Sequence, residues 1–298
     1  MFIDPLLVLR YNTSVFMGIL YLVATPIGNL QDITLRALSV LKQAALVAAE
    51  DTRTARQLLS HFEITTPVTS YFEHNKLKKL APILHALERG DVAMISEAGT
   101  PGLSDPGYEL VRAAIANSIQ VVPIPGPSAL IAALVASGLS TDQFIYLGFL
   151  PRQPTARRKL LQALATEIHT LVAFEAPHRI RASLEDVERV LGNREICIAR
   201  ELTKLYEEFI RGRVSQAREH FIVHPPRGEF VLVIGGASPK GFANPSDLTW
   251  DDARIKSQVK RLMKRGISRT DAVKRVAQES KRNRRHVYQL ALSKSHQK

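Results

Sequence analysis

The sequence predicts an α/β protein with two sheet-containing lobes, followed by a small, basic, all-helical domain. Short β-branched runs alternate with amphipathic stretches over residues 19–137, and a second such series begins near residue 144. Residues 250–298 instead have helical periodicity and many Lys and Arg residues. Repeated β-then-α units are typical of a mostly parallel sheet that is covered by helices.

Residues 1–17 are predicted to be a disordered N-terminal extension, or translation starts at Met17 rather than at Met1. Their apolar run "PLLVLR" is short, has no basic segment before it and has no small-residue cleavage site after it, so a signal peptide is not indicated. The first strong strand begins only at Ile19.

Residues 18–140 are predicted to form the first α/β lobe. Its β-branched runs predict strands over 19–24, 46–49, 92–95 and 121–122. Its apolar residues at helical spacing predict helices over 33–44, 54–62, 77–88, 108–115 and 128–135.

Residues 141–236 are predicted to form the second α/β lobe. Strands are expected over 144–147, 170–174, 196–199, 208–211 and 230–234, with helices over 155–166 and 180–191. The last strands follow one another without a long predicted helix between them, so this sheet is expected to be mixed rather than parallel.

Residues 237–249 are rich in Gly, Pro, Ser and Asn and are predicted to be a linker. Helices are expected after it over 251–264, 269–279 and 284–293, the last two arranged like a helix-turn-helix. Residues 250–298 contain 15 Lys and Arg against 4 Asp and Glu, which is a net charge of +11 out of +12 for the whole chain. Such a concentrated charge predicts a polyanionic partner.

The composition also excludes several classes of protein. The only cysteine, Cys197, lies in an apolar run, so disulfides and thiolate metal sites are excluded and a reducing, cytoplasmic location is expected. His220 and His224 are one helical turn apart but have no evident third ligand, so no metal site is expected. No apolar run is long enough to span a bilayer, and no membrane partner is expected.

Four unusual loops follow predicted strands, and they contain Pro, which restricts the backbone, and in most cases Gly, which frees it. In open parallel sheets, ligands bind beyond the carboxyl ends of the strands, so the four loops together favour a shared ligand cleft over four ordinary turns. Phosphate-binding P-loop and dinucleotide fingerprints are absent, which favours a nucleotide-like ligand that has a carboxylate and no phosphate. The loops are "ATPIGN" (24–29), "SEAGTPGLSDPG" (96–107), "PIPGPSA" (123–129) and "EAPHR" (175–179).

Seven segments, in this order, carry a resemblance to a known family. They are "LYLVATPIGNLQDITLRAL", "AAEDTR", "SEAGTPGLSDPGYELV", "PIPGPSALIAAL", "GFLPR", "FEAPHR" and "ARELTK". They resemble the ribosomal RNA small-subunit methyltransferase I family, which belongs to the tetrapyrrole-methylase fold class. The resemblance covers about residues 19–295.

The resemblance implies a two-lobed class III methyltransferase fold with S-adenosylmethionine between the lobes, a homodimer, and a C-terminal helical domain that binds RNA. The implied reaction is 2′-O-methylation of a cytidine in the decoding region of 16S rRNA, in the small ribosomal subunit. By similarity, the donor is expected to lie against Pro26, Ile27, Ala98, Gly99, Thr100, Leu103, Ser128, Ala129, Glu175 and Leu202.

Methyl transfer from a sulfonium to a hydroxyl requires oxygen, carbon and sulfur in line. Positioning alone contributes on the order of 7 kcal/mol, and a base that accepts the hydroxyl proton adds roughly 10²-fold. Among the acidic and basic residues at strand ends, Asp51, Arg53 and Glu97 are predicted to be catalytic. Asp51 is equally suited to capping the helix that follows it, and Glu97 and Asp105 are equally suited to bracing their loop.

Two other functions remain open at this stage. The first is a tetrapyrrole C-methyltransferase with the same fold, although such an enzyme needs no basic tail. The second is a DNA-binding regulator whose α/β lobes sense a ligand.

Overall fold

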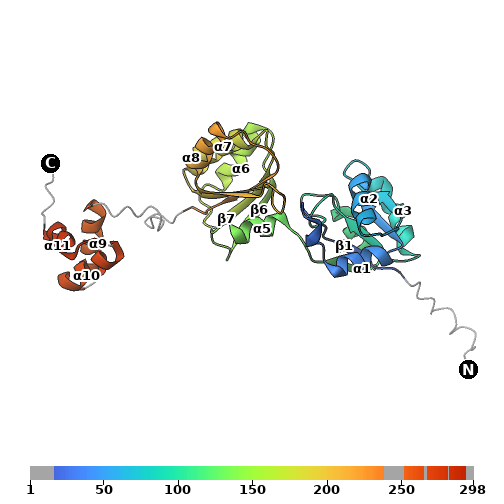
Figure 1. The fold of residues 1–298 in the computed structure, drawn as a ribbon, viewed down its shortest axis with the longest axis horizontal. Coiled ribbons are helices and arrows are strands. Elements are labelled where there is room, and N and C mark those ends of the chain that lie inside the picture. The colour runs from blue at the N-terminus through green and yellow to red at the C-terminus, as the bar shows by residue number, and fades with distance from the viewer. Residues whose placement is uncertain (1–16, 238–251, 265–266, 281, 293–298) are drawn as a thin grey trace, which may run out of the picture. The chain divides into compact units, whose positions relative to one another are not determined.

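The computed structural model describes residues 17–237, 252–264, 267–280 and 282–292. The chain divides into two compact units, Met1–Ala237 and Ser238–Lys298. The first unit contains two five-stranded sheets with their helices, and the described part of the second contains three helices (Figure 1). The predicted extension (1–17) and linker (237–249) lie almost entirely outside the described residues.

The first sheet is parallel throughout and has the strand order β3-β2-β4-β1-β5. Its strands are β1 (Leu20–Val23), β2 (Leu46–Ala49), β3 (Val68–Ser70), β4 (Val92–Ile95) and β5 (Val121–Ile124). The connecting elements are the 3-10 helix η2 (Leu30–Asp32) and the helices α1 (Leu35–Gln43), α2 (Thr52–His61), α3 (Lys76–Leu87) and α4 (Tyr108–Ala116). Strand β3 was not predicted, since it has only three half-buried residues.

Both faces of this sheet are covered, as the alternation of side chains along β4 shows. Ala93 and Ile95 pack in the core beneath α1 and α2, whereas Val92 and Met94 pack in the core beneath α3 and α4. A strand that is apolar on both faces is characteristic of a parallel sheet between two helical layers.

The second sheet is mixed, as expected, with the order β6-β7-β10-β8-β9. Only β6 and β7 pair in parallel, and the other three pairs are antiparallel. Its strands are β6 (Phe144–Phe149), β7 (Thr170–Glu175), β8 (Glu195–Arg200), β9 (Glu208–Arg213) and β10 (Phe230–Ile234). Its helices α6 (Pro154–Ala163), α7 (Ile180–Leu191) and α8 (Val214–Val223) cover one face (Figure 1).

The expectation that no long helix interrupts the last strands was wrong, because α8 lies between β9 and β10. Its buried residues are Val214, Ala217 and Phe221, while Ile222 and Val223 are exposed. With apolar residues on both sides of the helix, the sequence lacks the clear apolar stripe that normally identifies an amphipathic helix.

Helix α5 (Ala129–Ala136) falls within the first lobe of the sequence prediction (18–140), but it packs against the second sheet. Leu130, Ala133 and Leu134 lie in one core with β7, β8 and β10, where Cys197 is also buried. The chain therefore passes from the first sheet to the second just after β5, before α5 begins.

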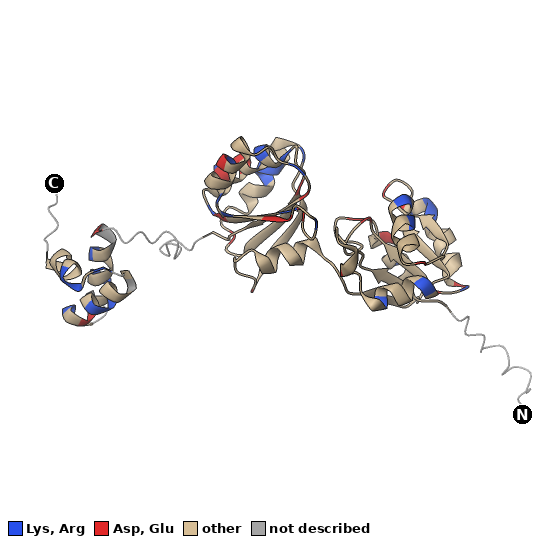
Figure 2. Cartoon of the chain, in the orientation of Figure 1, with Lys and Arg blue, Asp and Glu red and all other residues tan. Residues whose placement is uncertain are grey.

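The second unit has three helices among its described residues, namely α9 (Asp252–Lys264), α10 (Arg269–Ser280) and α11 (Arg284–Leu292). They share a core of their own, in which Ile255, Val259, Val273, Val276 and Val287 are almost fully buried. Lys and Arg residues are spread over the helices of this unit (Figure 2). In the described part of the chain, no helix is both long and apolar enough to cross a bilayer.

Candidate functional site

Three loops meet at the carboxyl edge of the first sheet and are tied together by hydrogen bonds. The amide of Thr25 donates to the carbonyl of Gly99 at 2.9 Å, and the amide of Gly99 donates to the carbonyl of Thr25 at 3.0 Å. The hydroxyl of Thr100 donates to the carbonyl of Pro127 at 3.1 Å. The loops after β1, β4 and β5 therefore form one platform, as expected for the ligand edge of a parallel sheet.

A cavity of about 820 Å³ opens on this platform and is lined from both lobes of the first unit. Its wall includes nine of the ten residues expected to contact a methyl donor, and also Glu97, which was expected to be catalytic. The nine are Pro26, Ile27, Ala98, Thr100, Leu103, Ser128, Ala129, Glu175 and Leu202.

Gly99, the tenth residue, is not among the residues that line the cavity, but its backbone pairs with Thr25 in the platform. Its φ of +79° is a conformation that L side chains rarely adopt. An added Cβ would also lie 3.3 Å from Cγ2 of Ile27. The backbone conformation of the paired loops thus favours a glycine at this position.

Asp51 and Arg53 do not line the cavity. Asp51 is the N-cap of α2, where its Oδ1 accepts a hydrogen bond from the amide of Arg53 at 2.7 Å. The guanidinium of Arg53 binds the same carboxylate at 2.9 Å and holds its pKa down at about 2. A catalytic role for this pair stays a prediction, and a folded Asp51→Ala variant with full methylation activity would contradict it.

Three carboxyl groups gather where β2 and β4 end: Glu50, Glu97 and Asp105. The amide of Glu97 donates to Oε2 of Glu50 at 3.3 Å, and burial raises the pKa of Glu50. Burial, with the nearby charges of Glu50 and Glu97, raises the pKa of Asp105 to about 7, although a hydrogen bond from Ser96 acts in the opposite direction. Asp105 lines the cavity and is therefore a titratable group at its wall with a pKa near neutrality.

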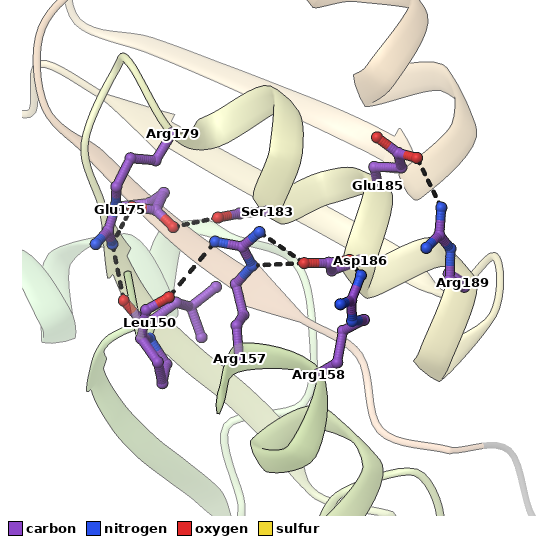
Figure 3. A network of polar contacts seen from close by, with 10 residues as sticks. Leu150, Arg157, Arg158, Glu175, Arg179, Ser183, Glu185, Asp186 and Arg189 are labelled. Carbon is purple, nitrogen blue, oxygen red and sulfur yellow. Dashed lines mark hydrogen bonds and ion pairs between the residues drawn. The ribbon is translucent and has the colours of Figure 1, made fainter. Parts of the chain in front are cut away.

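Glu175, at the end of β7, is held by a polar network rather than left open to a ligand (Figure 3). Its Oε1 accepts from Nε of Arg179 at 2.6 Å and from the amide of Ala176 at 2.8 Å. The hydroxyl of Ser183 donates to its Oε2, and Arg179 also donates to the carbonyl of Leu150 at 2.8 Å. The Glu175 side chain thus fixes the turn after β7, which forms part of the cavity wall.

Leu202 reaches the cavity from a turn in which Glu201 has a φ of +49°. Lys204 fixes this turn, since its Nζ donates to Glu201 at 3.0 Å and to Glu229 at 2.9 Å. A Cβ on Gly28 would lie 2.4 Å from Cγ of Lys204, so the loop after β1 and this turn approach closely only because residue 28 is glycine.

One face of α2 also lines the cavity and was not predicted. Its residues recur at intervals of three or four, which is the spacing of one helical face. The polar residues on this face could have predicted that α2 lines the cavity. A helix that follows a strand of the platform can direct its polar side chains toward the ligand edge of the sheet. The stripe consists of Thr54, Ala55, Gln57, Leu58 and His61.

The chain resembles known proteins over most of its length. Residues 19–218 match the family model of the tetrapyrrole (corrin/porphyrin) methylases. The ribosomal RNA small subunit methyltransferase I of Synechocystis is 48% identical over 278 residues, which are 93% of this chain and 98% of that protein. The protein with the same name from Bacillus subtilis is 41% identical, over 94% of this chain and 96% of its own length.

Solved structures agree on the fold. The uroporphyrin III C-methyl transferase of Thermus thermophilus superposes with a TM-score of 0.54 at 20% identity, over 73% of this chain and 97% of that chain. The cobalt precorrin-4 methyltransferase of cobalamin biosynthesis superposes with a TM-score of 0.58 at 17% identity, over 74% of this chain and 96% of its own. The predicted class III methyltransferase fold is confirmed, and the chain belongs to the ribosomal RNA small subunit methyltransferase I family of the tetrapyrrole methylases.

Proposed function

We propose that this protein transfers a methyl group from S-adenosylmethionine to the 2′-hydroxyl of a cytidine in the decoding region of 16S rRNA. Membership of the family supports the general reaction, which is S-adenosylmethionine-dependent methylation of small-subunit rRNA. The resemblance of the loop motifs supports the cytidine 2′-hydroxyl as acceptor. The main support for the proposal is the cavity, because nine of the ten residues that were expected to contact the donor line it together.

The chemistry of the cavity wall fits S-adenosylmethionine. The wall presents apolar side chains for the adenine, among them Ile27, Leu130 and Leu202. The hydroxyl of Thr25 is buried in the wall and has no hydrogen-bond partner in the described part of the chain, so a polar atom of a ligand would satisfy it. Ser128 and Ala129 place the N-terminus of α5 at the cavity, where a carboxylate is stabilised.

The cavity offers room and polar groups for a second occupant beside the donor. At about 820 Å³ it lies near the upper end of the range for pockets that hold one small molecule. The polar stripe on α2, which includes Gln57 and His61, offers hydrogen-bonding groups beyond the expected donor contacts. We place the target nucleoside on this side of the cavity.

When it is bound, the donor supplies an electrophilic methyl group on a positively charged sulfur. The protein must then hold the ribose hydroxyl in line with that group and exclude water from the reacting atoms. The platform of paired loops is suited to this task, because backbone hydrogen bonds and the Thr100 side chain fix its geometry before any ligand binds.

The second unit is proposed to bind the rRNA. Arg269, Lys274, Arg282, Arg284 and Arg285 are all exposed on it. Few aromatic side chains accompany these basic groups, so contacts to the phosphate backbone and to RNA shape are expected to dominate over base stacking. Affinity for rRNA should then fall steeply with salt, because neutralised phosphates release their counterions.

A homodimer in the cytoplasm is proposed as the working form. Helix α5 exposes Ile131 and Val135 one turn apart, although its other face is buried on the second sheet. Exposed apolar side chains on one helix face are suited to a contact with a second copy of the chain. Analytical ultracentrifugation should show a dimer, and a monomer at micromolar concentration would contradict this part of the proposal.

The decisive experiment incubates the protein with labelled S-adenosylmethionine and small ribosomal subunits from a strain that lacks the modification. Label should enter the rRNA, and mapping of 2′-O-methyl groups should place it on one cytidine. Label transfer to a tetrapyrrole, with none to rRNA, would instead support a C-methyltransferase. Retention on DNA without any methylation would support a ligand-sensing regulator.

A second variant separates the two units. Deletion of residues 248–298 should leave binding of S-adenosylmethionine nearly intact, because every described residue that lines the cavity belongs to the first unit. The same deletion should abolish rRNA methylation. Unchanged methylation would refute the proposed role of the basic unit.

A further inference from the structure

The proposed reaction releases the proton of a ribose hydroxyl, and five described side chains that line the cavity could accept it: His61, Glu97, Asp105, Glu175 and Glu229. Two of the five are already engaged. Glu175 accepts hydrogen bonds from Arg179 and Ser183, and Glu229 binds the ammonium of Lys204. The oxygens of both carboxylates are therefore occupied by other side chains and are not free to meet a substrate hydroxyl.

The remaining three groups differ in their surroundings. His61 is the last residue of α2, and its ring makes an edge contact with Phe62 at 4.8 Å. Glu97 is exposed, whereas Asp105 is half-buried at the cavity wall. Asp105 is therefore the carboxyl group that solvent stabilises less, and poor solvation makes a carboxylate more basic.

Among the described residues, the groups that affect the pKa of Asp105 are negative or neutral, and none of them is a cation. The ionisable groups that face it are Glu50 after β2, Glu97 after β4 and Tyr146 on β6. Burial and the two glutamates raise the pKa of Asp105 to about 7. A general base works best when its pKa lies near the operating pH, because it is then ionised often enough and still basic.

The segment that carries Asp105 is fixed to the other lobe. The hydroxyls of Ser104 and Tyr146 share a hydrogen bond of 2.6 Å. The pairing of β6 with β7 is irregular between Tyr146 and Phe149. In that irregularity Gly148 has a φ of +64°, and its added Cβ would lie 3.2 Å from Oγ of Ser104. Bulges are frequent beside active sites, where they direct a neighbouring side chain.

We propose that Asp105 is the proton acceptor of the methyl transfer and that Ser104 and Tyr146 position it. The 2′-hydroxyl loses its proton to the Asp105 carboxylate as its oxygen forms the bond to the methyl carbon. The bond between that carbon and sulfur breaks, and its electron pair stays on sulfur. The inference rests on the proposed function, since it requires a hydroxyl as the methyl acceptor.

The first test compares Asp105→Asn with the wild type and with Asp142→Asn, a matched change of an exposed aspartate outside the cavity wall. Asp105→Asn should lower kcat for rRNA methylation by about 10²-fold or more. Its affinity for S-adenosylmethionine, measured by calorimetry, should change little, and Asp142→Asn should behave like the wild type. Activity of Asp105→Asn within a few-fold of the wild type, or a loss confined to donor affinity, would overturn the assignment.

The second test changes the basicity of Asp105 and leaves its carboxylate in place. The wild-type rate should rise with pH to a plateau with a midpoint near 7, because only the ionised group accepts a proton. Glu50→Gln removes a neighbouring negative charge, so the pKa of Asp105 should fall and the midpoint should move to lower pH. An unmoved midpoint in a folded Glu50→Gln enzyme would overturn the assignment.

The two proposals fail in different ways. A wild-type protein that methylates no site on small subunits would overturn the proposed function and the inference together. A wild-type protein that methylates a ribose, beside an equally active Asp105→Asn, would overturn the inference alone.

Discussion

Asp105 should make the folded protein less stable at alkaline pH, and Asp105→Asn should remove that penalty. The pKa of the group is about 7 in the fold against 3.8 for an ordinary aspartate, so the unfolded chain ionises it first. A raised carboxyl pKa means that stability is lost as pH rises from about 4 to 7. Above pH 7 the full penalty is present, and below pH 4 it is absent.

The size of the effect follows from the difference between the two pKa values. Each pKa unit corresponds to about 1.4 kcal/mol, so a difference of about three units sets an upper bound of about 4 kcal/mol. Because the carboxyl is only partly buried, solvent screening reduces this to about 1–2 kcal/mol. For a unit of this length, that gain corresponds to a rise in melting temperature of about 2–8 °C.

The assay is thermal unfolding of the wild type, Asp105→Asn and Asp142→Asn at pH 4, 6 and 8. Asp105→Asn should melt above the wild type at pH 8, by a smaller margin at pH 6 and at the same temperature at pH 4. The Asp142→Asn control should follow the wild type throughout. A stability difference that does not depend on pH, or a less stable Asp105→Asn at pH 8, would refute the reasoning.

Three further predictions concern polar contacts and backbone geometry in the first unit. Tyr146→Phe removes the hydrogen bond to Ser104 and should lower kcat by about tenfold with little change in KM for the donor. A KM that rises as much as kcat falls would argue against a role of Tyr146 in positioning Asp105. Gly99→Ala should destabilise the fold by about 1–2 kcal/mol and weaken donor binding in calorimetry, because its φ of +79° suits glycine. Arg157→Ala leaves the buried carboxylate of Asp186 without its closest cation and should cost about 3–5 kcal/mol in urea unfolding, so a loss below 1 kcal/mol would contradict the buried ion pair.

Local patterns in the sequence were enough to locate most strands and helices, but they did not identify what each element packs against. The clearest case is α5, whose sequence "ALIAALVA" has no polar residue. A helix that is apolar all round shows no preferred face, so its assignment to the first lobe rested only on its place in the chain. Its contacts with Val172 and Val233 on the second sheet are long-range and leave no local signal.

The candidate site shows the same difference between what local sequence patterns predict and what depends on long-range contacts. The loops were predictable, because Gly and Pro after buried strands mark the ligand edge of a parallel sheet. The behaviour of single carboxylates was not, since it depends on which side chains the fold places beside each of them. Asp51 has its guanidinium partner two residues away, at Arg53, which a capping motif does not reveal. The pKa of Asp105 is raised by burial and by the charge of Glu50, which precedes it by 55 positions in the chain.

The burial of Cys197 gives the protein a practical advantage for spectroscopy. The thiol is 1% exposed, and burial raises its pKa, so little thiolate is available to react with alkylating reagents. Because the chain has no other cysteine, one introduced on an exposed helix position such as Gln289 would be labelled selectively in the folded protein. A fluorophore attached there would test directly whether the basic unit contacts the ribosomal subunit, as proposed.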